Sequence, residues 1–491
     1  MASSELNSIT YESLPQLLEH DTKVKVAGVD ADGLLRGKVM SKEKFLSIAK
    51  SGFGFCSGIF RWDMLDDMYP DDLLIKGKNT IDMPDMLAFP DLKTFRRIPW
   101  ENNMPFFLVS FHDPIQKNPM PACPRGLLKS TMEKLKAHGF GAMAGVEYEF
   151  AQFRVPPADL SGPASPQNRV SIAKYLENNS VSSLPPLTEG RFGYSITRSQ
   201  QNSEYFYSIF DSCKKFNCDI EGWHSETGPG VFEAALSYDE VQKLADKASL
   251  FKHAVKSIAI QYGITPCFMA KPWQNLPGNS GHMHISLVDA EGKNVFAREE
   301  KDPAAPYEDV ANLSDLGRHF LAGLLDGLPD IMPIFAPTIN SYKRLDEKFW
   351  APVTVSWGLE HRASSIRIIA PPTSKPGGTR FEVRVPGADT NPYYVLATIV
   401  ALGWRGIEKK LAIRHPPMAK EVSAEASGNP SLRLARTLNE ANERFLRKDS
   451  VAREIFSNEF VDHFGCTRRH EIRLFEQTVT DWEFRRYIET V

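Results

Sequence analysis

Residues 145–150 read Gly-Val-Glu-Tyr-Glu-Phe, residues 281–287 read Gly-His-Met-His-Ile-Ser-Leu, and residues 379–385 read Thr-Arg-Phe-Glu-Val-Arg-Val. Each stretch alternates apolar residues with polar ones. Because successive side chains of a β-strand point to opposite faces, each stretch predicts a strand with one core face and one polar face. One such strand alone is more typical of an ordinary solvated sheet. The three together carry mostly Glu, His and Arg on their polar faces, which indicates binding of metal or phosphate.

Acidic residues in these strands and in residues 221–233 (EGWHSETGPGVFE) predict a cation site. Five carboxylates in one cavity would repel one another unless cations offset their charge. Oxygen-rich ligands with one imidazole favour two Mg²⁺ or Mn²⁺ ions. A zinc site formed by His282 and His284 is the weaker alternative, because zinc would want more Cys or His ligands. The five carboxylates belong to Glu147, Glu149, Glu226, Glu233 and Glu382.

Arginines gather in the C-terminal part of the same region, as transfer of a phosphoryl group would require. The sequence has no GxxxxGK[ST] motif and no GxGxxG motif, so neither a P-loop nor a Rossmann turn is indicated. If the chain uses ATP, metal ions and arginines must hold it. The arginines are Arg344, Arg362, Arg367, Arg380 and Arg384.

Composition excludes several classes of function. The formal net charge of −3 across 491 residues gives no electrostatic footprint for nucleic acid or an anionic membrane. A small-molecule substrate fits better. The six scattered cysteines indicate a reducing, intracellular setting. We find no signal-peptide pattern and no apolar run long enough to span a bilayer, and we expect a cytoplasmic protein.

The chain reads as an α+β protein of two domains. Residues 1–115 contain short strand-like runs around a turn at residues 30–33, and a proline-rich segment at 113–124 predicts a linker. Residues 120–491 form the larger unit. Within it we expect a surface loop at residues 154–190 and a long helix at residues 238–262, opened by the capping box Ser237-x-x-Glu240 and closed by Gly263.

Six sequence blocks, which include the three polar strands, occur in the order found in a known enzyme family. They are GVEYEF, SETGPGVFE, FMAKPW with GHMHIS, NSYKRL, WGLEHRASSIRI and RFEVRVPGADTNPYYVLA. Together they resemble the signature blocks of the glutamine synthetase family over residues 120–410, and the N-terminal region is similar more loosely. The resemblance implies a small N-terminal β-grasp-like domain and a larger catalytic domain with a curved antiparallel sheet flanked by helices.

The resemblance also implies roles for individual residues. Glu149, Glu226 and Glu233 match the ligands of one metal ion, and Glu147, His282 and Glu382 match those of the other. Positions that contact the nucleotide in the family are matched by Glu221, His224, Ser286 and Arg380. Positions that hold glutamate are matched by Gly278, Arg344 and Arg384. Groups around the transferred phosphate are matched by His284, Arg362 and Arg367, and Tyr194 and Glu226 match residues of the ammonium pocket.

The implied reaction is ATP-dependent ligation. The γ-phosphate of ATP passes to the glutamate side chain, and ammonia or an organic amine then attacks the γ-glutamyl phosphate. Active sites in this family lie between the subunits of large ring-shaped homo-oligomers, so the resemblance implies a ring here as well.

Departures from the family pattern concern the acceptor. Trp350 stands where the family has a glutamate before its Ala-Pro pair, and residues 55–63 contain no clear counterpart of the family's Asp-Gly-Ser-Ser loop, although Cys56 or Asp63 could occupy that place. Substrate positions differ at Pro277, Val231 and His361. An aromatic, less anionic pocket favours an organic amine over ammonium. These features are similar to the subgroup that includes γ-glutamyl-amine ligases and fungal glutamine-synthetase-like proteins.

Other readings of the sequence stay open at this point. A catalytically silent scaffold or signalling protein could keep the same fold and even the same metals. True glutamine synthesis competes with ligation of a larger amine, and a guanidino kinase is a distant third possibility.

Overall fold

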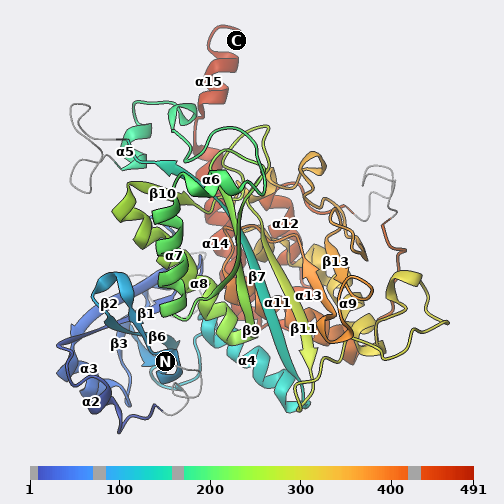
Figure 1. The fold of residues 1–491 in the computed structure, drawn as a ribbon, viewed down its shortest axis with the longest axis horizontal. Coiled ribbons are helices and arrows are strands. Elements are labelled where there is room, and N and C mark those ends of the chain that lie inside the picture. The colour runs from blue at the N-terminus through green and yellow to red at the C-terminus, as the bar shows by residue number, and fades with distance from the viewer. Residues whose placement is uncertain (1–8, 70–83, 157–170, 419–432) are drawn as a thin grey trace.

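Two β-sheets organise the chain (Figure 1). The computed structural model describes residues 9–69, 84–156, 171–418 and 433–491. A six-stranded sheet lies in the N-terminal part and an eight-stranded, mostly antiparallel sheet in the remainder, with helices packed on both. The predicted α+β class is therefore confirmed.

The N-terminal sheet has the arrangement expected of a β-grasp-like unit. Its strand order is β2-β1-β6-β4-β3, with β5 also paired to β6; β1 and β6 run parallel, and the other pairs are antiparallel. Phe45 of α3 (Lys42–Ile48) stacks on Phe107 with ring centroids 4.9 Å apart. The strands are β1 (Lys23–Val29), β2 (Leu35–Ser41), β3 (Phe53–Cys56), β4 (Asp85–Pro90), β5 (Arg96–Ile98) and β6 (Met104–His112).

The two faces of this sheet belong to different cores. Val26 and Phe107 point into a small core with α3, whereas Ala27 and Phe106 belong to the large core of the rest of the chain. The N-terminal sheet is therefore packed on both sides. The domain boundary near residues 115–120 stays a prediction.

The large sheet carries the three polar strands in adjacent positions. Its order is β12-β13-β14-β11-β7-β9-β8, with β10 also paired to β7, and β12 and β13 are the one parallel pair among the described strands of this sheet. The strands are β7 (Gly141–Arg154), β8 (Ile220–Ser225), β9 (Val231–Glu240), β10 (Ile264–Cys267), β11 (Gly281–Val288), β12 (Trp357–Leu359), β13 (Ile366–Ile369) and β14 (Arg380–Val383).

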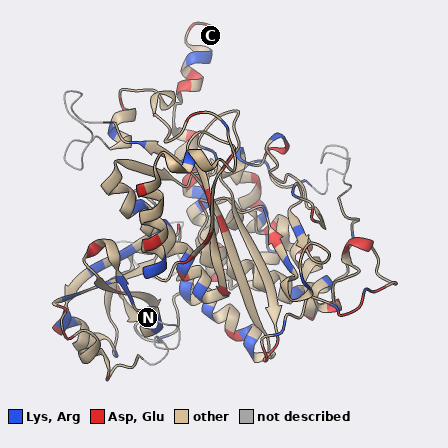
Figure 2. Cartoon of the chain, in the orientation of Figure 1, with Lys and Arg blue, Asp and Glu red and all other residues tan. Residues whose placement is uncertain are grey.

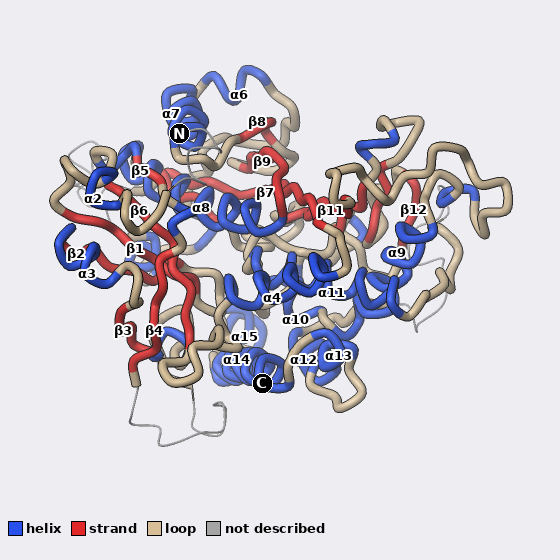
Figure 3. The backbone as a smooth tube through the Cα atoms, turned by 90° about the horizontal axis from the view of Figure 1, so that it is seen from below, coloured by secondary structure: helices blue, strands red, loops and turns tan. Residues whose placement is uncertain are grey.

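Helices cover one face of the large sheet (Figure 3). Tyr148, Met283 and Phe381 on the covered face are fully buried, as the alternation predicts. The covering helices are α4 (Pro124–Ala137), α8 (Val241–Ala259) and α11 (Pro392–Glu408). The remaining helices are α2 (Leu14–Leu17), α5 (Ile172–Leu176), α6 (Ile196–Gln200), α7 (Ser203–Lys215), α9 (Asp315–Gly327), α10 (Met332–Phe335), α12 (Leu438–Phe445), α13 (Val451–Ile455), α14 (Asn458–Gln477) and α15 (Asp481–Tyr487).

The long helix expected at residues 238–262 begins later than predicted. Strand β9 runs through Ser237 to Glu240, so α8 begins at Val241, and no side chain caps its first turn. The predicted capping box is therefore wrong. The helix end is as expected, because a short 3₁₀ turn is followed by Gly263 at φ 65° in the left-handed region that glycine tolerates.

The predicted surface loop at residues 154–190 is only partly described, because residues 157–170 lie outside the described residues. The remainder holds α5 and a 3₁₀ turn at Val181–Ser183, with mostly exposed side chains.

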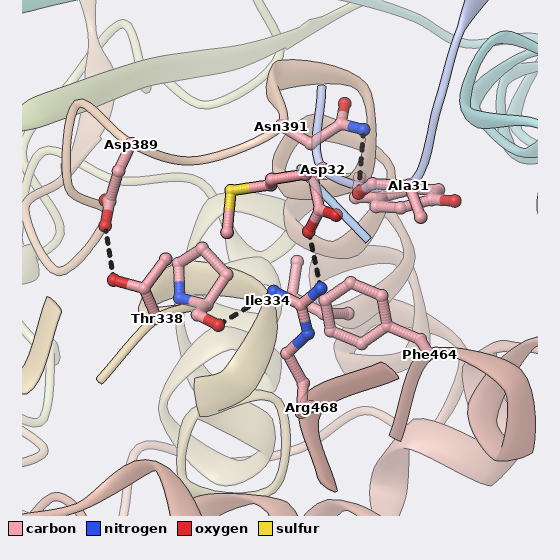
Figure 4. A pocket seen from close by; sticks show the side chains of 11 residues that line it. Ala31, Asp32, Ile334, Thr338, Asp389, Asn391, Phe464 and Arg468 are labelled. Carbon is pink, nitrogen blue, oxygen red and sulfur yellow. Dashed lines mark hydrogen bonds and ion pairs between the residues drawn. The ribbon is translucent and has the colours of Figure 1, made fainter. Parts of the chain in front are cut away.

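A buried ion pair ties the N-terminal turn to the C-terminal helix α14 (Figure 4). Arg468 donates to the carboxylate of Asp32 and, at 2.8 Å, to the carbonyl oxygen of Pro337. Both charged side chains are almost fully buried, beside a pocket of about 20 Å³. The first and last parts of the chain are therefore held together through charges removed from water.

Charged residues are interspersed over both sheets and their helices, and neither sign covers a whole layer (Figure 2). In the part of the chain that the structure describes, no helix combines the length and the apolar character needed to cross a bilayer.

Candidate active site

The polar face of the large sheet brings distant segments into register. Glu147 on β7 lies opposite His282 on β11, and His284 on β11 lies opposite Glu382 on β14. Residues separated by more than two hundred positions in the sequence therefore share one face.

The first cluster consists of Glu147, His282 and Glu382, whose ligand atoms lie within 4.8 Å of one another. Nδ1 of His282 is 3.4 Å from Oε1 of Glu382 and 3.7 Å from Oε2 of Glu147. Burial, followed by the charge of Arg384, lowers the pKa of His282 to about 4. The ring is therefore neutral near pH 7, and a nitrogen lone pair is free to bind a cation.

Two arginines hold the carboxylate of Glu382. Arg367 donates from Nη1 to one oxygen at 3.0 Å, and Arg384 donates from Nη1 to the other. Burial opposes ionisation of Glu382, but the charge that His282 carries when protonated and the charge of Arg384 outweigh burial and lower the pKa of Glu382 to about 2. Glu382 is thus a fixed, ionised carboxylate.

The second cluster consists of His224, Glu226 and Glu233. The His224 ring lies with Nδ1 3.5 Å from Glu226 and Nε2 3.5 Å from Glu233. Glu149 lies opposite Glu233 in the sheet, and its Oε2 accepts a hydrogen bond from the Ser280 backbone at 2.7 Å. The structure thus gathers His224 with two of the three predicted ligands, whereas Glu149 borders the group.

The donor set of both clusters fits divalent cations. Burial, followed by the charge of Glu233, raises the pKa of Glu149 to about 7, and burial also raises the pKa of Glu233. Facing carboxylates of this kind are stabilised as anions when a cation lies between them. Carboxylate oxygens with an imidazole suit Mg²⁺ or Mn²⁺. The metal roles themselves stay a prediction.

A cavity of about 760 Å³ adjoins the first cluster. Among the residues predicted on the nucleotide side, Glu221, Ser286 and Arg380 line it, whereas His224 is in the second cluster instead. His284 also lines it, with Nε2 3.1 Å from Glu147 and Nδ1 3.3 Å from Nε of Arg380.

The residues predicted to hold glutamate lie around the end of β14. Arg344 is buried and donates to the carbonyl oxygens of Val385 at 2.8 Å and Arg384 at 2.9 Å. A Cβ on Gly278 would lie 2.3 Å from the carbonyl oxygen of Ala270, so no larger residue fits there. Nε of Arg384 is buried without a hydrogen-bond partner among the described residues, which leaves a donor for a bound carboxylate.

Three predicted residues lie on exposed loops. Trp350 is 74% exposed and Tyr194 is 70% exposed, both at positive φ. Arg362 is also exposed, and its charge acts on Tyr194, where it opposes the rise in pKa that burial and then Glu226 produce. Tyr194 therefore lies within electrostatic range of Glu226 in the second cluster and of Arg362. The side chain of Trp350 stands in solvent.

Asp63, one of two residues considered for the place of the family's loop aspartate, is engaged within its own chain. Its Oδ2 lies 3.1 Å from Nε2 of His470 on α14, and its Oδ1 accepts hydrogen bonds from the backbones of Leu65 and Asp67. Cys56 is exposed at the end of β3. Asp63 is therefore not free to serve a neighbouring site.

Sequence reasoning missed Tyr238, Lys293 and Asn294, which also line the cavity. Tyr238 was not predicted as a cavity residue because residues 238–240 fit the predicted helix. The alternation of residues 231–240 would instead have extended the strand. Asn294 donates to the carbonyl oxygens of Gly377 and Thr379 and closes one wall. No local signal in the sequence marks that contact.

The family model described as the catalytic domain of glutamine synthetase matches residues 121–487. The chain is 43% identical over 471 residues to type-1 glutamine synthetase 2 of Dictyostelium discoideum, covering 95% of this chain and 84% of that one. It is 34% identical to a glutamate–isopropylamine ligase of a Pseudomonas species, covering 95% of each chain. It is 31% identical to gamma-glutamylethanolamide synthetase GlnA4 of Streptomyces coelicolor, covering 95% and 92%.

Solved structures have the same fold. A GmaS/ADP complex matches with a TM-score of 0.75 at 23% identity, covering 97% of this chain and 99% of that chain. GmaS without ligand matches with a TM-score of 0.76 over the same shares.

Proposed function

Because the chain belongs to the glutamine synthetase family, we propose that it is an ATP-dependent ligase that joins the γ-carboxylate of glutamate to ammonia or an organic amine through γ-glutamyl phosphate. The family resemblance drawn from six sequence blocks is confirmed by the match over residues 121–487.

One observation carries the proposal: the first carboxylate–imidazole cluster lies beside a cavity of about 760 Å³, and the second lies on the same face of the same sheet, around β8 and β9 next to β7. Glu147 belongs to the first cluster and also lines the cavity. A nucleotide bound there would place its phosphates beside the cluster. Such an arrangement suits phosphoryl transfer, in which positioning and charge stabilisation do most of the catalytic work.

We infer that the site takes ATP and two Mg²⁺ or Mn²⁺ ions. Glu147, His282 and Glu382 would hold one ion. Glu226 and Glu233 would hold the other, with Glu149 as the predicted third ligand and His224 beside them. Bound cations would offset the negative charge of the phosphates and carboxylates.

Other residues of the chain would bind the nucleotide and glutamate. The cavity residues Glu221, Ser286 and Arg380 would hold the nucleotide. The free Nε of Arg384, supported by Arg344, would bind the carboxylate of glutamate at the close approach that Gly278 permits.

In the first step the γ-carboxylate attacks the γ-phosphorus of ATP, and ADP leaves. His284 and Arg362 would contact the migrating phosphate, while Arg367 holds Glu382 in place. In the second step the amine nitrogen attacks the acyl carbon, phosphate leaves with the bonding electron pair, and the new amide releases a proton.

Release of ADP and phosphate tests the proposal directly. Purified protein would be given ATP, glutamate and Mg²⁺ or Mn²⁺, with ammonium or one of a panel of amines as acceptor. Release that requires both glutamate and an acceptor supports the ligase. ATP binding without turnover across the panel would instead support the silent scaffold, and phosphorylation of a guanidino compound would support the kinase.

Substitution of Trp350 tests the inference that the acceptor pocket has changed. Trp350→Glu is expected to raise the ratio of kcat/KM for ammonium to kcat/KM for ethylamine by about tenfold, a change of about 1.4 kcal/mol. A carboxylate attracts the small ammonium ion more strongly than an indole does. Trp350→Phe is the control and should leave the ratio near that of the parent protein. An unchanged ratio in Trp350→Glu would remove this residue from the acceptor pocket.

We also propose that the chain forms a large ring-shaped homo-oligomer with active sites between subunits. Helix α15 projects from the body of the molecule (Figure 1). Trp482 and Phe484 of this helix, and Ile488 directly after it, are exposed to solvent. Apolar side chains gathered on a projecting helix favour burial against another chain, here a second copy.

Deletion of residues 479–491 is expected to lower the mass of the assembly, because it removes these apolar side chains. Light scattering coupled to size-exclusion chromatography would measure the mass. Replacing only the exposed charges Arg485 and Asp481 by alanine keeps the apolar face and serves as the control. An unchanged mass after the deletion would show that other surfaces hold the subunits.

We propose a cytoplasmic location on the chemistry of the cysteines. All six are free thiols in the structure, as a reducing compartment would leave them.

A further inference from the structure

Lys271 lies where three segments meet beside the residues predicted to hold glutamate. Its backbone N–H donates to Oδ1 of Asn340 at 2.8 Å, and its carbonyl oxygen accepts from Nδ2 of Asn340 at 3.0 Å. Its ammonium group donates to the carbonyl oxygen of Leu276 at 2.5 Å. The same ammonium group lies 4.1 Å from the centre of the Phe349 ring. One residue therefore contacts parts of the chain that are far apart in the sequence.

Two of these segments carry predicted glutamate residues. Lys271 belongs to a loop of residues 270–279, which we name the Gly278 loop, and a backbone hydrogen bond of 2.8 Å joins the two ends of this loop. Asn340 stands at the start of a short 3₁₀ turn that ends at Arg344. The paired hydrogen bonds between Lys271 and Asn340 therefore hold the Gly278 loop against the turn that carries Arg344.

The third segment comprises residues 346–350, and we name it the Trp350 segment. It consists of a 3₁₀ turn over Glu347–Phe349, which the side chain of Asp346 caps, and of Trp350 at φ 58° in the left-handed region. A 3₁₀ turn of three residues has too few internal hydrogen bonds to fix its own position. The segment therefore depends on contacts with its surroundings, and the ring of Phe349 provides one of them.

The ammonium group of Lys271 and the ring of Phe349 form a cation–π contact. Both side chains are half-buried. Burial lowers the pKa of Lys271, and the charge of Asp346 opposes that shift. A cation–π contact becomes stronger when the cation has lost part of its water. The hydrogen bond to Leu276 keeps the ammonium group in place over the ring.

We propose that Lys271 is a positioning residue that fixes the Trp350 segment to the Gly278 loop. With this link in place, the Trp350 segment keeps one position relative to Gly278 and Arg344. Without it, the 3₁₀ turn is free to move away, and the loop before Gly278 loses the hydrogen bond at Leu276. The consequence for glutamate rests on the proposed ligase function. The cavity proposed for the nucleotide is lined by other segments of the chain.

Hydrogen–deuterium exchange of the full-length protein without substrates tests the link. Lys271→Met keeps the length of the side chain and removes its charge. The backbone amides of residues 347–350 are expected to exchange about tenfold faster in this variant, because the segment opens more often. Lys271→Arg keeps a cation over the ring and should restore the exchange rate of the parent protein. Unchanged exchange in Lys271→Met would overturn the inference.

A double-mutant cycle shows whether Lys271 acts through Phe349. Phe349→Leu keeps an apolar side chain and removes the aromatic face, so it should accelerate exchange of the Trp350 segment by a similar factor. The double variant should exchange no faster than the faster single variant, because one contact can be lost only once. Factors that multiply in the double variant would mean that the two side chains act separately, and the link would be refuted.

Steady-state kinetics show what the link does in the reaction. Lys271→Met is expected to raise KM for glutamate about tenfold, because the Gly278 loop and the Trp350 segment are both displaced. KM for ATP should change by less than about twofold. Lys271→Arg should return KM for glutamate to near the parent value. An equal rise in both KM values, or a rise in neither, would show that Lys271 does not position the glutamate site.

Lys38→Met is the matched control. Lys38 also donates to a carbonyl oxygen, that of Gly54 at 3.3 Å, and lies 4.8 Å from the centre of the Phe53 ring, but it belongs to the N-terminal sheet. This variant should leave the exchange of residues 347–350 and both KM values unchanged, and an effect equal to that of Lys271→Met would overturn the inference.

Failure of the link and failure of the ligase give different results. Absence of turnover in the parent protein with every acceptor would refute the ligase, whereas the exchange measurements need no turnover and still decide the link. If Lys271→Met does not fold, Phe349→Leu is compared with Phe349→Tyr, which keeps the aromatic ring. Equal exchange of the Trp350 segment in these two variants would then overturn the inference.

Discussion

Glu382→Gln is expected to lower the rate of ADP release by about 10³-fold. The amide keeps the shape of the side chain but removes the charge that faces His282 and balances Arg367 and Arg384. A bound cation would lose an anionic ligand, and two buried guanidinium groups would lose their shared partner. We therefore expect the variant also to lose the rise in Tm that Mn²⁺ should give the parent protein.

Glu360→Gln is the matched control. Glu360 also pairs with Arg367, through Nε at 3.0 Å, but it stands outside the cluster and is more exposed. Its loss should reduce the rate by less than about tenfold and leave Mn²⁺ stabilisation in place. Equal losses in the two variants, or a Glu382→Gln protein that keeps a tenth of the parent rate, would show that Glu382 is not a cation ligand.

Arg468→Met is expected to lower the free energy of unfolding by about 3–5 kcal/mol, because it leaves Asp32 as an uncompensated charge in a buried position. The pair joins residues 436 positions apart in the sequence, so its loss should also loosen the N-terminal sheet from α14. Urea unfolding measured separately by fluorescence and by far-UV circular dichroism would report both effects.

Two further variants define what the Arg468→Met result means. Asp481→Asn removes one partner of an exposed pair on α15 and should change stability by less than about 1 kcal/mol. The double variant Asp32→Leu with Arg468→Met should be more stable than Arg468→Met alone, because both charges are removed together. A double variant as unstable as the sum of the two singles would mean that the ion pair is not the source of the effect.

The faces of the strands could be predicted from the sequence, because alternation is a local property. Val146, Tyr148 and Phe150 form part of the core as their spacing predicts. Stretches of helix with a buried stripe were equally readable, and α8 contains the stripe from Val241 to Ile258. Its start was misplaced because Ser237 and Glu240 fit a helix cap as well as a strand, and only pairing with β7 decides between the two.

Which residues form each cluster could not be predicted from local sequence patterns. His224 enters the second cluster because β8 and β9 pair with His224 opposite Glu233. The register depends on the turn at residues 226–230, not on the type of either residue. In the same way, the contact of Asp63 with His470 depends on how α14 packs against the N-terminal sheet, which no periodicity predicts.

Glu147 and Glu149 stand two residues apart on one strand, one in the first cluster and the other beside the second. A strand advances about 3.3 Å per residue, so the geometry of β7 sets the two carboxylates about 7 Å apart. Pairing with β9 on one side and β11 on the other keeps this spacing constant. The positions of the two clusters are therefore coupled. A single-residue insertion between Glu147 and Glu149 would turn one of these carboxylates into the core. It would abolish one cluster and spare the other.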